Sequence, residues 1–524
     1  MSPSELRLPG GTGELHPAVL GRRLNDGAVV ALAGLVAVGL ALAIALAMPK
    51  PNYPLVLGGV VGLLALAALV TSPRLELTAG GLVFYLGCIN GPLKLISSTG
   101  TLGSALQNVL IGAIVLGVAL RQLLSRERFR LPPLSGWAVG FVGVVLLEAF
   151  NPKTLNILKV GAGFRDQLQY VPFFIFGWLL VRSKARLRKV FLLLGVIALA
   201  NGVVSSYQSR LSPSQASSWG AGYEQKYEGH AAKTFKSEGE GRVRPTGLGD
   251  ESGGGGGAGI VAIAGVLALL ATTRKRKWLL SLLLFGSIAA IATSLGRIEL
   301  VGGVLAVVAY ALLTGSAGRA ARRPLRYLLV ALALAIPFGV IYVTTLGEGT
   351  FARYSSLLSG EGSNSASYKQ NELKQIPKEV AADPFGFGLG TAGPAAGFGG
   401  KSTELLEGHN VNAETTYNFI VKEVGLPGVL IWLGAILSMI GLAFRRIRTF
   451  ADNELQIYLA AVFAPVIAMF FMSFEGPVTQ SQVLSPFYWF ALGAAGYWLA
   501  GPGWQAARRR ISSTAPPPSV PVAA

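Results

Sequence analysis

Residues 257–323 have the sequence GAGIVAIAGVLALLATTRKRKWLLSLLLFGSIAAIATSLGRIELVGGVLAVVAYALLTGSAGRAARR, and this stretch decides the fold. It holds three apolar runs, Gly257–Thr272, Trp278–Ser294 and Ile298–Thr314, each near the roughly 20 residues that an α-helix needs to cross a bilayer. The basic cluster RKRK separates the first two runs, and the short turn SLGR separates the second and third. The stretch therefore predicts three membrane helices joined by short turns.

The same pattern extends over the whole chain of 524 residues, which is 52% hydrophobic and only 14% charged. A soluble domain averages about 25% charged residues, so the composition excludes an ordinary cytosolic enzyme and a disordered chain. The sequence predicts an all-α, polytopic integral membrane protein with about 14 transmembrane helices. The expected spans are Ala28–Met48, Tyr53–Val70, Leu77–Leu95, Ser104–Leu124, Leu134–Phe150, Leu168–Val181, Val190–Tyr207, Gly257–Thr272, Trp278–Ser294, Ile298–Thr314, Tyr327–Leu346, Leu426–Phe444, Leu455–Ser473 and Val483–Ala500.

The net charge of +19 reflects topology rather than a nucleic-acid partner, because the basic clusters fall in alternate connections between the spans. Lys and Arg favour the cytoplasmic side of short loops. We therefore expect a multi-pass protein of the bacterial cytoplasmic membrane, in contact with membrane lipids, with both termini in the cytoplasm. The single cysteine, Cys88, and three scattered histidines offer no disulfide framework and no metal site, so we expect neither a metal nor a cofactor.

The predicted spans and loops divide the chain into seven segments, two of which are long extracytoplasmic loops. They are a cytoplasmic N-terminal segment (1–26), an N-terminal transmembrane bundle (27–207), an extracytoplasmic loop (208–256), central transmembrane helices (257–346), a large extracytoplasmic catalytic loop (347–425), C-terminal transmembrane helices (426–500) and a disordered cytoplasmic tail (501–524). Long loops in a compact fold are often functional, so we expect any chemistry on the outer face.

The second long loop ends in GHNVNAETTYNFIVKEVGLPG, residues 408–428. Its spacing predicts a short helix with Asn412 as N-cap and Gly425 at its end. His409 lies just before this helix and can act as a base near neutral pH, although for this residue alone a histidine that only satisfies a turn is the favoured interpretation. Upstream, residues 365–391 predict an amphipathic interfacial helix followed by a glycine-rich turn, DPFGFGLG.

Five of the arginines on the predicted outer side are candidate phosphate ligands. A guanidinium keeps its charge and offers paired donors to phosphate oxygens, although a single arginine such as Arg297 is also typical of an interface anchor. These arginines are Arg165, Arg242, Arg244, Arg297 and Arg353. The glycine run at 253–257 is typical of either a phosphate nest or a flexible entry to a span, and the flexible entry is the favoured interpretation.

The order of these motifs over about residues 160–450 resembles the bacterial O-antigen ligase and polysaccharide polymerase superfamily. The motifs on which the resemblance rests are an RPTG segment before a span, an S-x-G-R turn, the DPFGFGLG turn and the block HN…EVGLPG. The stretch SASYKQ departs from the family, whose members often carry an arginine and a tryptophan there. Members have about a dozen spans, so the count here is fourteen, or twelve if the family pattern holds.

The resemblance implies a metal-independent, inverting glycosyltransferase that uses a polyprenyl-diphosphate-linked glycan donor at the outer face of the membrane. It implies His409 as general base, Arg165, Arg244 and Arg297 as diphosphate ligands, and further substrate contacts from Arg242, Arg353 and Asn410. The favoured function is polymerisation of repeat units of a surface polysaccharide or exopolysaccharide, alongside other polysaccharide assembly proteins. One alternative is a ligase that moves finished glycan to a lipid or protein acceptor. The alternative from another class is a transporter or flippase of lipid-linked sugars, which would favour polar groups at the bilayer midplane.

Overall fold

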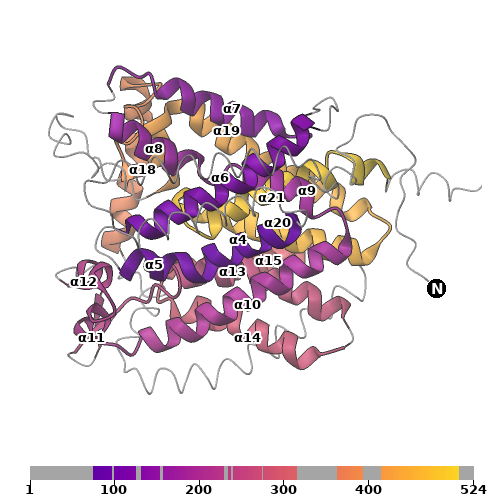
Figure 1. The fold of residues 1–524 in the computed structure, drawn as a ribbon, viewed down its shortest axis with the longest axis horizontal. Helices are drawn as coiled ribbons and strands as arrows, with labels where there is room; N and C mark the ends of the chain where they lie inside the picture. Colours follow the sequence, from indigo (N-terminus) through magenta and orange to yellow (C-terminus); the bar gives the residue numbers. More distant parts are fainter. Residues whose placement is uncertain are drawn as a thin grey trace, which may run out of the picture. The chain divides into compact units, whose positions relative to one another are not determined.

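The computed structural model describes residues 75–96, 100–124, 131–153, 157–228, 234–237, 240–273, 275–315, 363–393 and 415–506. These residues are mostly helical, with very little strand (Figure 1). The expected spans Ala28–Met48, Tyr53–Val70 and Tyr327–Leu346 lie outside them, as do Arg353, His409, Asn410 and Asn412.

Seven helical segments within the described residues are long and apolar enough to cross a membrane. They are Glu76–Ile96, Gly103–Leu120, Lys184–Gln208, Gly254–Thr272, Arg297–Thr314, Thr416–Thr449 and Asn453–Met472. Two apolar helices, Ser135–Glu148 and Lys277–Thr293, are shorter. The chain is therefore a helical protein of membrane type.

Contacts divide the chain into two units, residues 1–83 with 104–131 and residues 84–103 with 132–524. The first helices are α4 (Leu75–Phe84), a π-helical turn η1 (Tyr85–Ile89), α5 (Asn90–Ile96) and α6 (Thr101–Leu124). The next are α7 (Ser135–Glu148), α8 (Ile157–Leu168), α9 (Phe173–Leu180) and α10 (Lys184–Gln208). The π-helical turn changes the backbone hydrogen-bond register, and Asn201 of α10 donates its amide to the Gly87 carbonyl in that turn at 2.9 Å.

The centre of the second unit is formed by α13 (Gly254–Thr272) and α20 (Asn453–Met472). In the apolar stretches of α13 and α20, 89% and 83% of the residues are buried, so both helices are enclosed by protein. Around them pack α10, α14 (Lys277–Thr293), α15 (Arg297–Thr314) and α21 (Leu484–Trp498) (Figure 1). Further helices of the described part are α18 (Ser363–Ala382), α19 (Thr416–Arg446), and the 3-10 turns η5 (Ile447–Thr449) and η6 (Val478–Gln480).

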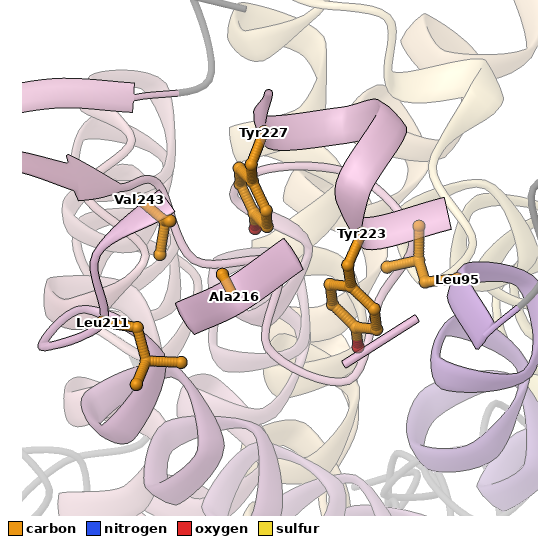
Figure 2. Close-up of a cluster of buried hydrophobic side chains, with 6 residues drawn as sticks. All are labelled: Leu95, Leu211, Ala216, Tyr223, Tyr227 and Val243. Carbon is orange, nitrogen blue, oxygen red and sulfur yellow. The ribbon is translucent and has the colours of Figure 1, made fainter. Parts of the chain in front are cut away.

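The segment between α10 and α13 is folded and has a small apolar core of its own. It contains α11 (Pro213–Ser217), α12 (Ala221–Tyr227) and an antiparallel hairpin of β1 (Thr234–Ser237) and β2 (Glu240–Val243). Figure 2 shows the buried cluster that joins these elements to α5, namely Leu95, Leu211, Ala216, Tyr223, Tyr227 and Val243. About half of the expected extracytoplasmic loop at 208–256 is thus regular structure.

The expected span Leu168–Val181 is wrong as a single spanning helix. Only Phe173–Leu180 is helical there, which is about 12 Å of helix and too short for a bilayer. Hydropathy counted the apolar residues but not the turn at 169–172, where Pro172 precedes the helix. The short helix is stable here because it packs against α21 through Gly177 and Gly493, where a Cβ atom would overlap the opposite backbone.

The glycine run at 253–257 also differs from expectation. Gly253 is the N-cap of α13 with φ 91°, and a Cβ at Gly256 would overlap the side chain of Glu299. Gly254 and Gly255 face the turn around Thr246 and Gly247. The run is a closely packed helix start rather than a flexible entry.

Connecting segments of the second unit contact one another in two groups. At one end, Lys184 pairs with Asp452 and Glu454 at 2.9 Å each, and Arg448 donates to the Leu312 carbonyl. These are all segments expected on one side of the membrane. At the other end, segments expected on the opposite side contact one another, as the candidate site below illustrates.

We expect the two glycines between α9 and α21 to tolerate no side chain. Gly493→Ala should lower the free energy of unfolding by about 1–3 kcal/mol, because its Cβ would overlap the Phe174 backbone. Gly143 of α7 is the matched control, since a Cβ there meets nothing within 4 Å. Gly143→Ala should be neutral or stabilising by up to about 1 kcal/mol. Thermal unfolding of the purified variants in detergent measures both, and equal losses would contradict this packing.

Candidate functional site

The DPFGFGLG motif forms a turn, residues 383–393, that only glycine can build. Gly386, Gly388, Gly390 and Gly393 have φ values of 85°, 92°, 74° and 64°, in the left-handed region where other residues are strained. Gly390 also packs directly on α8, because its Cβ would overlap the Lys159 carbonyl. We call residues 383–393 the glycine turn. The sequence predicted a helix followed by such a turn, and α18 ends at Ala382 immediately before it.

The EVGLPG motif forms a break in α19 that fits against the glycine turn. Gly425 has φ 67° and ψ −166° and divides α19 into a short first helix and a long second one. The Phe387 amide donates to the Lys422 carbonyl at 2.7 Å, and the Leu426 amide donates to the Pro384 carbonyl at 2.8 Å. The predicted short helix ending at Gly425 is confirmed. Its N-cap is Thr415, whose hydroxyl accepts from the Asn418 amide, and not the predicted Asn412.

Glu423 joins these two motifs to α8. Its side chain is fully buried, and its carboxylate accepts hydrogen bonds from the Gln167 amide at 2.9 Å, the Gly390 amide at 3.0 Å and the Ala392 amide at 3.4 Å. A buried carboxylate without donors is costly, whereas three N–H donors satisfy much of its hydrogen-bonding capacity. The carboxylate therefore holds together three segments that are far apart in the sequence.

Two further groups fix the glycine turn from the end of α7. Asn151 donates to the Gly386 carbonyl at 3.3 Å and to Glu148 at 2.8 Å. Lys153 forms an ion pair with Asp383, and its ammonium lies 5.7 Å from the centre of the Phe387 ring. The turn is thus held on several sides.

The start of α19 is fixed to the connection between α20 and η6. The Thr416 amide donates to the Ser473 and Gly476 carbonyls at 3.1 and 3.2 Å, and its hydroxyl donates to Gly476 at 2.8 Å. The same hydroxyl accepts from the Val478 amide at 2.8 Å. These bonds fix the helix that follows His409 by six positions in the sequence.

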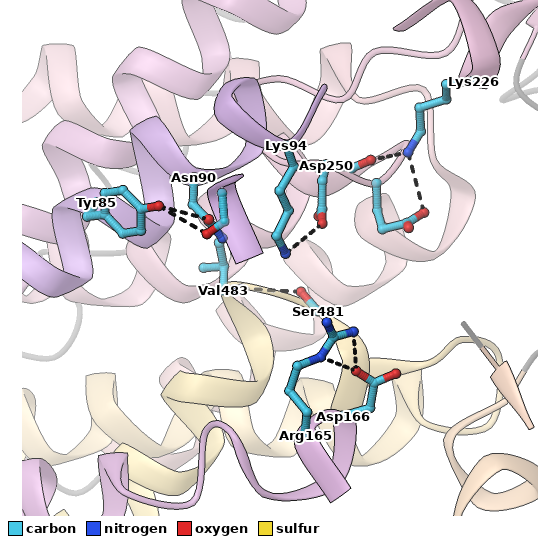
Figure 3. Close-up of polar contacts among 11 residues, drawn as sticks. Tyr85, Asn90, Lys94, Arg165, Asp166, Lys226, Asp250, Ser481 and Val483 are labelled. Carbon is cyan, nitrogen blue, oxygen red and sulfur yellow. Dashed lines mark hydrogen bonds and ion pairs between the residues drawn. The ribbon is translucent and has the colours of Figure 1, made fainter. Parts of the chain in front are cut away.

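A cluster of charged side chains lies at the same end of the second unit, next to α8 (Figure 3). Arg165 donates through Nε and Nη2 to one oxygen of Asp166, at 3.1 and 2.9 Å. Lys94 of α5 pairs with Asp250 at 3.1 Å, and Lys226 of α12 bonds the Asp250 carbonyl. Burial raises the pKa of the Asp166 carboxyl above its usual value, opposed by the charges of Arg165 and Lys94. The charge of Lys94 acting on Asp166 places α5, α8 and the segment before α13 in one electrostatic environment.

The other candidate arginines that the structure describes lie on nearby elements of this end. Arg244 follows β2, and its carbonyl accepts from the buried hydroxyl of Tyr227 at 3.0 Å. Arg242 donates to the Arg210 carbonyl at 2.8 Å and so links the hairpin to the end of α10. Arg297 is the first residue of α15, which starts against the glycine run through Glu299. Arg244 begins the segment 244–256, Arg297 begins the helix whose Glu299 packs against the glycine run, Arg165 pairs with Asp166 on α8, and Arg242 has a structural bond.

Sequence reasoning missed Glu423, Gln167 and Lys94 as members of this site. Glu423 lies two positions before the helix-breaking Gly425, and an acidic residue at that place is a usable signal. Gln167 and Lys94 carry no such signal, since their partners lie 256 and 156 residues away in the sequence. No group of three or more His, Cys, Asp or Glu residues that could hold a metal ion is found in the described part of the chain.

Comparison with known proteins adds no family assignment: no family model matches the chain, and no curated protein matches it.

We expect Glu423→Ala to lower the free energy of unfolding by about 3–5 kcal/mol, because three buried N–H groups lose their acceptor. Glu423→Gln keeps one acceptor oxygen for the glycine turn and should cost less. Thermal unfolding and limited proteolysis near residues 383–393 provide the measurement. Glu475→Ala is the control, since Glu475 is an exposed acid at the same end. An Ala variant as stable as this control would contradict the role of Glu423.

Proposed function

We propose that this chain is a membrane glycosyltransferase that polymerises repeat units carried on a polyprenyl diphosphate at the outer face of the bacterial cytoplasmic membrane. One observation carries the proposal. The two motifs most specific for the O-antigen ligase and polymerase superfamily, DPFGFGLG and EVGLPG, form one buried unit around Glu423. Motifs that share a catalytic task are expected to meet in space, and this unit lies at the arginine-bearing end of the fold.

The proposed topology has two long extracytoplasmic loops and both termini in the cytoplasm. Support comes from the two groups of contacts between connecting segments. Lys184, Arg446 and Arg448 belong to the group at the proposed cytoplasmic end, where Lys and Arg are favoured. The glycine turn, Arg165 and Arg297 belong to the opposite end, which we propose faces outward.

In the proposed reaction, the Nε2 or Nδ1 atom of His409 takes a proton from a hydroxyl of the acceptor sugar. The hydroxyl oxygen attacks the anomeric carbon of the donor glycan, and a new glycosidic bond forms as the bond from that carbon to the phosphate oxygen breaks. The electron pair leaves with the polyprenyl diphosphate, and direct displacement inverts the anomeric centre. Positioned base catalysis of this kind contributes about 10²–10⁴-fold.

Arg165, Arg244 and Arg297 have the role of stabilising charge on the leaving diphosphate, with Asn410, Arg242 and Arg353 as further substrate contacts. Fixed guanidinium groups aimed at developing charge are an effective form of electrostatic catalysis. Arg165 forms an ion pair with Asp166, which holds its guanidinium in a defined orientation on α8. The bond from Arg242 to Arg210 makes Arg242 the weakest member of this set.

The experiment that tests the proposal measures polyprenyl-linked glycans in a strain that lacks this protein, complemented with wild type or with His409→Ala. A polymerase predicts that single repeats accumulate on the lipid in the deletion strain. Long finished chains left on the lipid would instead show a ligase. A pool unchanged from wild type would overturn both and would direct attention to transport.

We expect His409→Ala to reduce glycan transfer by at least about 100-fold, because the acceptor hydroxyl loses its base. The amount of protein in the membrane should stay unchanged, which immunoblotting of membrane fractions checks. His230→Ala is the matched control, a histidine of the other proposed outer segment. Near-normal transfer by His409→Ala would remove His409 from the mechanism.

We expect Arg297→Lys to lower transfer about tenfold or more, because an ammonium is a point charge and cannot form the paired bonds of a guanidinium. The control is Arg448→Lys at the opposite end of the fold. Rates of transfer with purified lipid-linked donor give the comparison. Equal rates for the two variants would support a role for Arg297 as an interface anchor only.

A further inference from the structure

Two basic segments that are far apart in the sequence meet at the Lys184 end of the second unit. One is the start of α10, and the other is the turn that leads from α13 into α14. The Arg188 guanidinium donates through Nη2 to the Thr273 hydroxyl at 3.3 Å, across 85 positions of the sequence. We call the exposed cations of these two segments the basic patch, which consists of Arg188, Lys189, Lys275, Arg276 and Lys277.

The packing of α10 against α14 sets the same register. Both helices begin at this end, and they pack side by side (Figure 1). A Cβ atom at Gly195 would contact Leu283, and one at Gly202 would contact the Ala290 amide nitrogen. These two pairs have the same offset in sequence, so the helices run parallel. Two helical turns earlier, the same register sets Arg188 beside Arg276.

The basic patch carries positive charge that its own segments do not balance. Residues 182–189 and 271–281 contain no Asp or Glu. Two acids at this end, Asp452 and Glu454, pair with Lys184 at the start of α10. Like charges held close together repel one another and oppose the compact state. An anion at the basic patch would offset this repulsion.

Apolar side chains continue from the basic patch along both helices. Trp278 is 73% exposed and follows the patch directly, and Leu282 is exposed one turn further along α14. On α10, Leu192 and Val196 are exposed and follow Arg188 at intervals of four residues, so the three share a helix face. Exposed apolar faces of a membrane helix contact lipid chains, and tryptophan is enriched at the boundary with the headgroups. The order along both helices is therefore cation first and hydrocarbon surface second, as in a phospholipid.

We propose that the basic patch binds the phosphate of an anionic phospholipid, whose chains lie along the apolar faces of α10 and α14. Clusters of Lys and Arg at helix ends attract anionic lipids, and a guanidinium offers paired donors to phosphate oxygens. A lipid suits the site better than free phosphate, because the apolar faces continue from the cations. The bound phosphate holds the starts of α10 and α14 together. This inference is independent of the proposed function, since it concerns the opposite end of the fold.

The test is native mass spectrometry of the purified full-length protein in detergent, titrated with phosphatidylglycerol or with phosphatidylcholine of the same chains. We expect phosphatidylglycerol to bind at least about tenfold more tightly. The double variant Lys189→Gln/Lys275→Gln removes one cation from each segment and should weaken that binding about tenfold or more, because each lysine near an anionic lipid surface contributes roughly fivefold.

The matched control is Lys374→Gln/Lys378→Gln, which removes the same charge from exposed positions of α18 at the other end. It should change phosphatidylglycerol binding less than about twofold. Both double variants change exposed residues, so their thermal unfolding should match that of the wild type.

Three results would overturn the inference. Phosphatidylcholine that binds as tightly as phosphatidylglycerol would show a contact with chains alone. Equal weakening by the two double variants would show an effect of net charge rather than of this site. Displacement of phosphatidylglycerol by an equal concentration of inorganic phosphate would show an anion site that needs no lipid chain.

Discussion

The buried carboxylate of Glu423 is the interaction on which the arrangement of the candidate site depends. It brings N–H groups of the glycine turn and the side chain of Gln167 to one point. The left-handed glycines allow this approach, because a side chain at Gly390 or Gly425 would overlap the neighbouring backbone. Charge, hydrogen bonds and backbone shape are therefore coupled, and none of the three segments adopts its position independently.

The same principle of close backbone contact recurs through the second unit. Gly177 and Gly493 bring α9 against α21, and the glycine run lets α13 start beside Glu299. Inside a membrane the apolar side chains gain little by leaving lipid, so helix association relies on packing and on small residues at the interfaces. The high glycine content, 68 residues, is consistent with this requirement.

The sequence predicted the helices and turns of the site better than the contacts between them. Apolar runs located most described helices, and the helix before DPFGFGLG and the break at Gly425 were both anticipated, because glycine and proline act locally. The link through Glu423 was not predictable, since its partner Gln167 lies 256 residues away. The prediction of a membrane span at α9 was wrong for a related reason. Hydropathy measures composition, whereas the length of α9 is set by the turn before it and by α21. The role of His409 stays a prediction from sequence.

The partnership of α9 and α21 has a consequence for the order of biosynthesis. The indole of Trp498 donates to the carbonyl of Val181 at 2.6 Å, across a sequence separation of 317 residues. At about 5–20 residues per second, a ribosome takes roughly 15–60 s to synthesise that interval. Throughout this time α9 has emerged without the helix that covers it, and at eight residues it cannot cross the bilayer alone. The nascent chain therefore carries an incomplete membrane segment until α21 is made, so this region assembles late in biosynthesis.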